Sequence, residues 1–399
     1  MSTTTAASTR PDIDLLDPEF YRADPHPAFT WMRAHEPVYR DERNGLWAVT
    51  RHADVLDVER NSATFASGQG YRSWWAPGEN SIIAQDDPEH LSQRRLVSNR
   101  FTPRAVRGQE DWLRRTIDEM LAPVEASGEL DVIPGLAAQL PCRLTAKLLG
   151  FPEDRWPDVR VWSEKLMRID LAPRDDRVFE DLFATIGEFD TLLSEVVPER
   201  RGCPADDLVS VWANADIAGE QGYSHDRMIH EVGLFIAGGA ETTRTVIAHG
   251  LHTFAAHPEQ WDLLADRPEL VPGAVEELIR WVTPLNNFFR TALDDATIGD
   301  QPVAAGDRII ILYPSANRDE AVFVDPFTFD VTRNPNPHVA FGHGTHFCIG
   351  ANLARYELGL LFGELTRRFA PPVALSECVV EPNIFARSVS SFRCELTAR

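Results

Sequence analysis

The sequence has few cysteines and no long uninterrupted apolar run. Its cysteines are scattered, at positions Cys142, Cys203, Cys348, Cys378 and Cys394. A small, odd-numbered set of this kind is typical of reduced intracellular thiols and does not form a disulfide framework. No Cys-x-x-Cys spacing is present to hold zinc or an iron–sulfur cluster. Because no apolar stretch reaches the length of a membrane span, we expect a cytoplasmic protein without a membrane anchor.

Positive charge is also scarce. The 399 residues carry 39 Lys and Arg against 61 Asp and Glu, which gives a formal net charge of −22. This balance argues against nucleic acid as a general partner. The first residues, 1–9, are rich in Ser, Thr and Ala and have neither the basic start nor the apolar core of a signal peptide. We expect residues 1–16 to form a disordered tail and residues 17–399 to form a single domain.

Helical patterns dominate the remaining chain. Residues 109–200 read as several helices joined by Pro- and Gly-marked turns, and the longest helical pattern runs from Ser224 to about Ala256. Two apolar, β-prone runs flank Asn44-Gly45 and predict a hairpin. Residues 309–313 predict a buried strand, and residues 382–392 predict a second hairpin. The expected fold class is therefore mostly α with a small β region.

Residues 67–87 contain several Gly and Pro residues, which break regular structure, together with Tyr71, Trp74, Trp75, Ile82 and Ile83. A long loop with so much aromatic and apolar surface either packs onto the core or covers an apolar pocket. The residues of this loop do not decide between the two interpretations.

One cysteine stands in a glycine-rich loop that leads directly into an amphipathic helical run. The loop is Phe341-Gly-His-Gly-Thr-His-Phe-Cys-Ile-Gly350, so the thiol of Cys348 lies close to a helix N-terminus, which favours a thiolate. A thiolate is a metal ligand or a nucleophile, and His343 and His346 are candidate bases for the second role. A buried structural thiol is the common alternative.

The long helical pattern contains an unusual run, Ala237-Gly-Gly-Ala-Glu-Thr-Thr243. Each mid-helix glycine costs roughly 1 kcal/mol relative to alanine. Another backbone or side chain must therefore approach closely at Gly238 and Gly239, or the helix must open there.

The complete ten-residue loop pattern, Phe-Gly-x-Gly-x-His-x-Cys-x-Gly, closely resembles the haem-binding loop of the cytochromes P450, and three further motifs occur in that family's order. The resemblance implies haem b, with Cys348 as the axial ligand of the iron and Phe341 shielding its sulfur. It implies that the haem propionates are held by His90, Arg94, Arg290 and His346. Gly238 and Gly239 would form a groove for oxygen, and Glu241 and Thr242 would deliver protons. Glu277, Arg280 and Arg333 would form a structural cluster.

The implied activity is that of a soluble bacterial monooxygenase, which inserts one atom of O2 into a C–H bond. Two electrons would come from a separate ferredoxin and ferredoxin reductase, docked on a basic patch that includes Arg95, Arg100 and Arg104, and the protein would be a monomer. Two rival classes are a non-catalytic haem protein, such as a gas sensor or carrier, and a peroxide-using or rearranging haem enzyme. The intact Glu241-Thr242 pair argues against both.

The candidate substrate contacts are apolar or aromatic almost throughout, and none carries a fixed charge. Burying an ionised substrate against such residues is unfavourable, whereas each buried methylene contributes about 0.8 kcal/mol. We therefore expect a steroid, a terpenoid or a fatty-chain lipid, as for the actinobacterial sterol- and lipid-oxidising members that the chain resembles. A macrolide or an aromatic natural-product intermediate is the alternative, and Arg72 is a candidate for holding a carboxylate at the pocket mouth. The candidate contacts are Tyr71, Trp74, Trp75, Ile82, Ile83, Leu234, Phe235, Ala237, Leu285, Asn286, Phe288 and Phe385.

Overall fold

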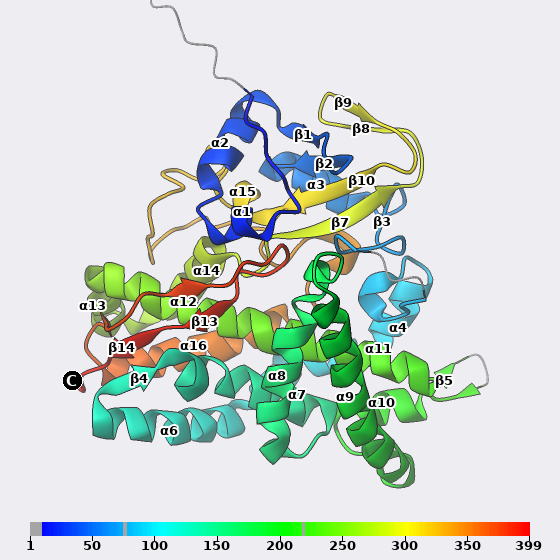
Figure 1. The fold of residues 1–399 in the computed structure, drawn as a ribbon. Coiled ribbons are helices and arrows are strands. Elements are labelled where there is room, and N and C mark those ends of the chain that lie inside the picture. Colours follow the sequence, from blue (N-terminus) through cyan, green and yellow to red (C-terminus); the bar gives the residue numbers. More distant parts are fainter. Residues whose placement is uncertain (1–9, 75–77, 218–219) are drawn as a thin grey trace, which may run out of the picture.

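The computed structural model describes residues 10–74, 78–217 and 220–399, and most of them are helical. Figure 1 shows a small β region, built from early (blue) and late (yellow) segments, beside a larger helical part. The prediction of a mostly α chain with a small β region is confirmed. Within the described ranges, no helix has the length and apolar character needed to cross a membrane.

The helices are α1 (Pro18–Arg22), α2 (His26–His35), α3 (His52–Arg60), α4 (Glu89–Ser98), α5 (Pro103–Arg107), α6 (Glu110–Ser127), α7 (Gln139–Leu149), α8 (Trp156–Leu166), α9 (Asp176–Gly202), α10 (Leu208–Asn214), α11 (His225–Ile236), α12 (Thr242–Ala256), α13 (Pro258–Asp266), α14 (Val271–Val282), α15 (Tyr313–Ala316) and α16 (Ala351–Arg368).

The strands are β1 (Val38–Asp41), β2 (Leu46–Val49), β3 (Phe65–Ala66), β4 (Glu129–Asp131), β5 (Asp216–Ile217), β6 (Glu220–Gln221), β7 (Asn287–Ala292), β8 (Ala296–Ile298), β9 (Gln301–Val303), β10 (Arg308–Leu312), β11 (Val373–Ala374), β12 (Val379–Val380), β13 (Val389–Ser391) and β14 (Arg393–Glu395).

The largest sheet joins strands from an early part of the sequence, within residues 38–66, to strands from residues 287–312. Its order is β1-β2-β10-β7-β3, and the predicted hairpin at Gly45 forms its first two strands. Strand β10 pairs parallel to β2 and antiparallel to β7, so it is central, and its isoleucines are buried on both faces. Residues 10–16, which we expected within a disordered tail, pack beside this sheet: Leu15 is fully buried and its N–H donates to Asp41. Residues 1–9 lie outside the described part of the chain.

The long central helix has an opening where the two glycines stand. Helix α11 and helix α12 are joined by a π-helical turn over Ala237–Glu241, in place of one unbroken α-helix. The two glycines have different structural roles. A Cβ atom at Gly239 would lie 2.8 Å from the Oγ1 atom of Thr145 on α7, whereas one at Gly238 would meet nothing within 4 Å. Tight packing explains Gly239, and Gly238 leaves space open.

Two apolar clusters lie against this central helix. One gathers buried side chains of α6, α7, α12, α13, α14 and α16. The other gathers those of α8, α9, α10 and α11. The first cluster thus packs α12 and the second packs α11, so the helical segments before and after the π-helical turn are both held by apolar side chains.

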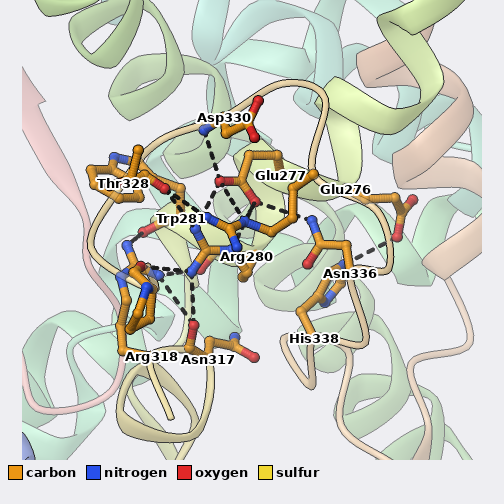
Figure 2. Close-up of polar contacts among 12 residues, drawn as sticks. Glu276, Glu277, Arg280, Trp281, Asn317, Arg318, Thr328, Asp330, Asn336 and His338 are labelled. Carbon is orange, nitrogen blue, oxygen red and sulfur yellow. Dashed lines mark hydrogen bonds and ion pairs between the residues drawn. The ribbon is translucent and has the colours of Figure 1, made fainter. Parts of the chain in front are cut away.

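A buried ion pair ties the helical part to the segment that leads into the cysteine loop (Figure 2). Glu277 and Arg280 on α14 have no exposed side-chain surface, and their side chains form two hydrogen bonds of 2.7 Å. Arg280 also donates to the carbonyl oxygens of Asn317 and Pro326. Glu277 accepts from the N–H of Asp330 and from the side chains of Arg333 and Asn336. The irregular segment 317–336 is therefore organised around this pair.

Replacing Glu277 by Ala should lower the free energy of unfolding by about 3–5 kcal/mol, because Arg280 would be left buried without its partner. Chemical denaturation of the purified protein measures this change. The matched control is Glu269→Ala, which removes the exposed partner of Arg267. A Glu277→Ala protein as stable as the control protein would contradict the structural role of the pair.

Candidate active site

Cys348 lies near the end of its loop, between a backbone hydrogen bond to the start of the loop and the first turn of α16. Its backbone N–H donates to the carbonyl oxygen of Phe341 at 2.9 Å, and α16 begins shortly after it, at Ala351. Burial raises the pKa of the Cys348 thiol, while the N–H groups of Gly350 and Ala351 and the charge of Arg94 act in the opposite direction. The loop therefore directs several groups that stabilise a thiolate towards the sulfur.

Two glycines of the loop are required by its backbone. Gly342 and Gly344 have φ angles of 65° and 67°, in the left-handed region that favours glycine. A Cβ atom at Gly344 would lie 2.2 Å from the carbonyl oxygen of Glu59 on α3. The loop consequently packs directly on the backbone of α3, which no other residue at this position would permit.

A second ionic cluster, formed by Glu276, Arg355 and His338, holds the aromatic ring of Phe341 in place. Arg355 lies over this ring at 4.5 Å and forms hydrogen bonds of 2.7 and 2.9 Å with Glu276. His338 contacts the same carboxylate at 3.0 Å (Figure 2). Burial opposes ionisation of Glu276, but its hydrogen bonds with His338 and Arg355 lower its pKa to about 2. This carboxylate is thus ionised at neutral pH and holds both Arg355 and His338 beside Phe341.

A cavity of about 240 Å³ opens between the cysteine loop and the central helix. Cys348 and Phe341 line one side, and Gly238, Gly239 and Thr242 line another. Four basic side chains from three separate parts of the sequence also line it: His90 and Arg94 on α4, Arg290 on β7, and His346 in the cysteine loop.

The two histidines in this cavity have unused ring nitrogens. The Nε2 atoms of His90 and His346 are buried without a hydrogen-bond partner, and the rings lie 4.2 Å apart between centroids. Burial and the charge of Arg290 lower the pKa of His346 to about 2, and burial also lowers the pKa of His90. Buried polar atoms without a partner are rare, so these two nitrogens point to a polar group that would occupy this part of the cavity.

These residues fit a haem. Its carboxylates would supply acceptors for the two histidines and counter-charges for Arg94 and Arg290, and the thiol of Cys348 is a suitable axial ligand. The apolar remainder of the cavity, which includes Leu144, Val246 and Leu353, suits the body of a macrocycle. The structure therefore brings all the predicted propionate contacts and the predicted ligand to one cavity.

The predicted proton-delivery pair is divided between the cavity and the protein interior. Thr242 lines the cavity, and its hydroxyl donates to the carbonyl oxygen of Gly238 at 2.8 Å, across the π-helical turn. Glu241 is buried and is not among the residues lining either cavity; its carboxylate lies 3.0 Å from Arg244. Burial raises the pKa of Glu241, while Arg244 acts in the opposite direction. The net shift in pKa is upward, so burial favours the protonated form of Glu241 more than water would.

A second cavity of about 560 Å³ continues from the first towards the aromatic loop, and most of the candidate substrate contacts line one or both cavities. Trp75 lies outside the described residues. The residues that line both cavities are Ile83, Leu234, Gly238, Leu285 and Phe288. Ile82 and Phe235 line the first cavity, and Tyr71, Trp74, Ala237 and Phe385 line the second.

Two expected substrate contacts have structural partners instead. Asn286 is buried and its side-chain amide donates to the carbonyl oxygens of Asn383 and Ile384, so it fixes the turn that carries Phe385. Arg72 forms a buried ion pair with Asp170 and lies over the ring of Phe385 at 4.1 Å. Its charge is therefore neutralised by the protein, and a substrate carboxylate would have to displace Asp170.

Sequence reasoning missed Glu59, which lines the first cavity from α3. It accepts a 2.5 Å hydrogen bond from Tyr313 and lies 3.8 Å from Arg290, and burial raises its pKa to about 7. In the sequence, Glu59 is one charged residue at the end of an ordinary amphipathic helix, so no local signal distinguishes it.

Comparisons with known proteins agree with this site. A family model described as Cytochrome P450 matches residues 188–383. A steroid C26-monooxygenase of Mycolicibacterium smegmatis is 39% identical over 92% of this chain and 91% of the relative. Linalool 8-monooxygenase of Pseudomonas putida is 35% identical over 89% of this chain and 91% of the relative. Among solved structures, a Mycobacterium marinum cytochrome P450 in complex with pseudoionone superposes with a TM-score of 0.89 at 34% identity, covering 98% of this chain and 100% of that one.

The role of Cys348 can be tested by its effect on the haem spectrum. The reduced protein with carbon monoxide should show the strongly red-shifted absorption band of thiolate ligation, and Cys348→Ala should abolish it. Cys142, which is fully buried on α7, is the matched control, and Cys142→Ala should retain the band. Retention of the band by Cys348→Ala protein with full haem content would overturn the assignment.

Proposed function

The chain belongs to the cytochrome P450 family and is a haem-thiolate monooxygenase of hydrophobic small molecules, and from this premise we propose that it hydroxylates an unactivated carbon of a steroid, a terpenoid or a fatty-chain lipid. The observation that carries the proposal is the lining of the joined cavities. Aromatic and aliphatic side chains form most of it, and the guanidinium of Arg72 is already paired with Asp170. A site of this kind favours a large apolar body over an ionised group.

The names of similar proteins support the same substrate class. The mycobacterial relative described above is named for steroid oxidation, and the Pseudomonas relative for linalool oxidation. Identities of 39% and 35% leave room for differences in pocket shape, so we extend the class of substrate to this chain and not an individual compound.

We propose the following division of roles around the haem. Bound haem supplies the chemistry that activates O2, which the protein directs but does not itself perform. Cys348 ligates the iron, and Phe341 covers the sulfur. The two histidines and two arginines of the cavity hold the propionates. Gly238 leaves space beside the π-helical turn, the hydroxyl of Thr242 holds a proton at the cavity wall, and Glu241 replenishes that proton from the interior.

The reaction requires O2 and an electron donor. We propose that the donor is a ferredoxin, reduced by a ferredoxin reductase, and that the protein works as a cytoplasmic monomer. Arg95 and Arg104 are exposed, and α5, which carries Arg104, packs against α16 directly after the cysteine loop. The five free cysteines agree with a reducing compartment.

The proton role of Thr242 predicts a loss of coupling. Thr242→Ala should bind haem and substrate normally but divert electrons into peroxide or water, whereas Thr242→Ser, which keeps the hydroxyl, should restore product formation. Thr253→Ala on the same helix is the control, because Thr253 lines neither cavity. The measurement is the ratio of product formed to electrons consumed. An unchanged ratio in Thr242→Ala would remove this hydroxyl from proton delivery.

The substrate class is tested by titrating the protein with two sets of compounds and following the haem absorption. Steroids, terpenoids and fatty-chain lipids should shift the spectrum at lower concentration than macrolides or small charged aromatics. Trp74, which contacts Phe179 edge-to-face at the wall of the second cavity, should contribute to this binding. Trp74→Ala should weaken it about tenfold, the effect of about 1.4 kcal/mol of lost apolar contact.

The control for Trp74→Ala is Phe327→Ala, an exposed aromatic residue that lines neither cavity. A spectral response to small charged aromatics without a response to lipids would refute the proposed class. A response confined to macrolides would favour the alternative that the protein modifies a natural-product intermediate.

A further inference from the structure

A buried glutamate on the central helix has no part in the roles assigned so far. Glu231 on α11 is 2% exposed and lies among apolar side chains, where a carboxyl group is unfavourable unless it is hydrogen-bonded. Its Oε1 atom accepts a 3.0 Å hydrogen bond from the backbone N–H of Ile82. Glu231 itself is not among the residues that line either cavity.

The hydrogen bond to Glu231 gives the backbone N–H of Ile82 an acceptor, which the segment around Ile82 does not itself provide. Ile82 is the first residue of a short 3₁₀ turn, Ile82–Ala84, and the first N–H groups of a helical turn have no acceptor within that turn. Burial raises the pKa of Glu231 to about 8, while the N–H of Ile82 and the charge of Arg227 act in the opposite direction and Glu79 acts with burial. The carboxyl group thus need not carry a full charge near neutral pH to accept this bond.

The adjacent residue on α11 reinforces the attachment. His230 forms a 2.8 Å hydrogen bond between its Nδ1 atom and the Oδ1 atom of Asn80. Two consecutive residues of α11 therefore hold positions 80 and 82 of the same segment. A separate contact fixes the base of the loop, where Asp86 accepts from the N–H groups of Ser67 and Gly68, so the base is held by bonds that do not involve α11.

The segment held in this way forms part of the cavity wall. Ile82 lines the first cavity, and Ile83 lines both cavities. Leu234, on the same helix as Glu231, also lines both. The position of the 3₁₀ turn relative to α11 consequently sets the separation between Ile83 and Leu234, where the two cavities join.

We propose that Glu231 is a positioning residue for ligand selection: by holding the N–H of Ile82, it fixes Ile82 and Ile83 against α11 and sets the width of the junction between the two cavities. The inference rests on the haem cavity described above and is independent of the lipid substrate class. It concerns ligands that would extend from the cysteine side of the first cavity past Ile83, and a ligand too small to do so would be unaffected.

The test uses the haem-loaded protein and two nitrogen ligands of iron, imidazole and the bulkier 4-phenylimidazole. Glu231→Leu should raise the Kd for 4-phenylimidazole about tenfold and leave that for imidazole within about twofold. The reason is that loss of one buried hydrogen bond to a carboxyl group changes a binding constant by about one order of magnitude. Glu231→Gln keeps an acceptor oxygen and should restore the original ratio of the two Kd values. Glu259→Leu, at an exposed position on α13, controls for the substitution itself.

Hydrogen exchange provides a readout that needs no ligand. The amide of Ile82 should exchange about tenfold faster in Glu231→Leu and at nearly the original rate in Glu231→Gln. The amides of Ser67 and Gly68 should be unchanged in both variants. An unchanged ratio of Kd values, an equal loss for both ligands, or a Gln variant that behaves like the Leu variant would overturn the proposal.

A second pair of variants tests the same bond from the other side, should Glu231→Leu fail to fold. Ile82→Pro removes the N–H donor, and the preceding Ser81 already has the extended backbone, ψ 158°, that a proline requires after it. Ile82→Ala removes the same apolar side chain but keeps the donor. The Pro variant should bind 4-phenylimidazole about tenfold more weakly than the Ala variant, and equal binding would refute the proposal.

The same binding measurements show which assignment is wrong when an expected effect is absent. If imidazole does not perturb the haem spectrum of the unmodified protein, the haem assignment fails. If imidazole and 4-phenylimidazole behave as described but steroids and lipids do not bind, only the substrate class fails.

Discussion

The arrangement of the cysteine side of the cavity depends on one buried carboxylate and the guanidinium beside it. Glu277 and Arg280 have no exposed side-chain surface, so every hydrogen-bonding atom that they carry must find a partner inside the protein. They find these partners in the backbone of segment 317–330 and in Arg333 and Asn336. A segment with almost no regular structure is thereby given one conformation, and it leads directly into the loop that carries Cys348.

The carboxylate of Glu276, next to Glu277 on α14, fixes the position of the Cys348 sulfur through a further series of contacts. Glu276 holds Arg355 and His338, which lie against the ring of Phe341, and the carbonyl oxygen of Phe341 in turn accepts from the N–H of Cys348. The position of the thiol is thus set by successive contacts that begin on α14. This explains why two adjacent acidic residues on one helix have different partners: Glu277 organises the segment before the loop, and Glu276 organises the loop itself.

The opposite side of the cavity combines rigid packing with local irregularity. The π-helical turn at Ala237–Glu241 places Thr242 at the cavity wall and directs Glu241 towards Arg244 in the interior. The aromatic loop is held to its surroundings by buried polar contacts, Arg72 with Asp170 and Glu231 with Ile82. The loop therefore covers an apolar pocket and also packs onto the core, so both interpretations of its aromatic composition describe part of it.

Local sequence patterns are sufficient to predict the fold class, the family and the residue types of the cofactor site. These patterns are the ten-residue cysteine loop, the glycine pair in a helix, and histidine and arginine at helical spacing. The sequence also predicted the strand near Ile309 and the hairpin at Gly45, which depend on neighbouring residues. Which polar and charged groups are available to a ligand follows from the tertiary structure. Arg72 is neutralised by Asp170, Asn286 is used by the turn at Asn383, and Glu59 and Glu231 become buried. Each of these outcomes depends on a partner distant in the chain, and the pKa of a carboxyl group or the availability of a guanidinium is set by that partner and by burial, neither of which a local pattern contains.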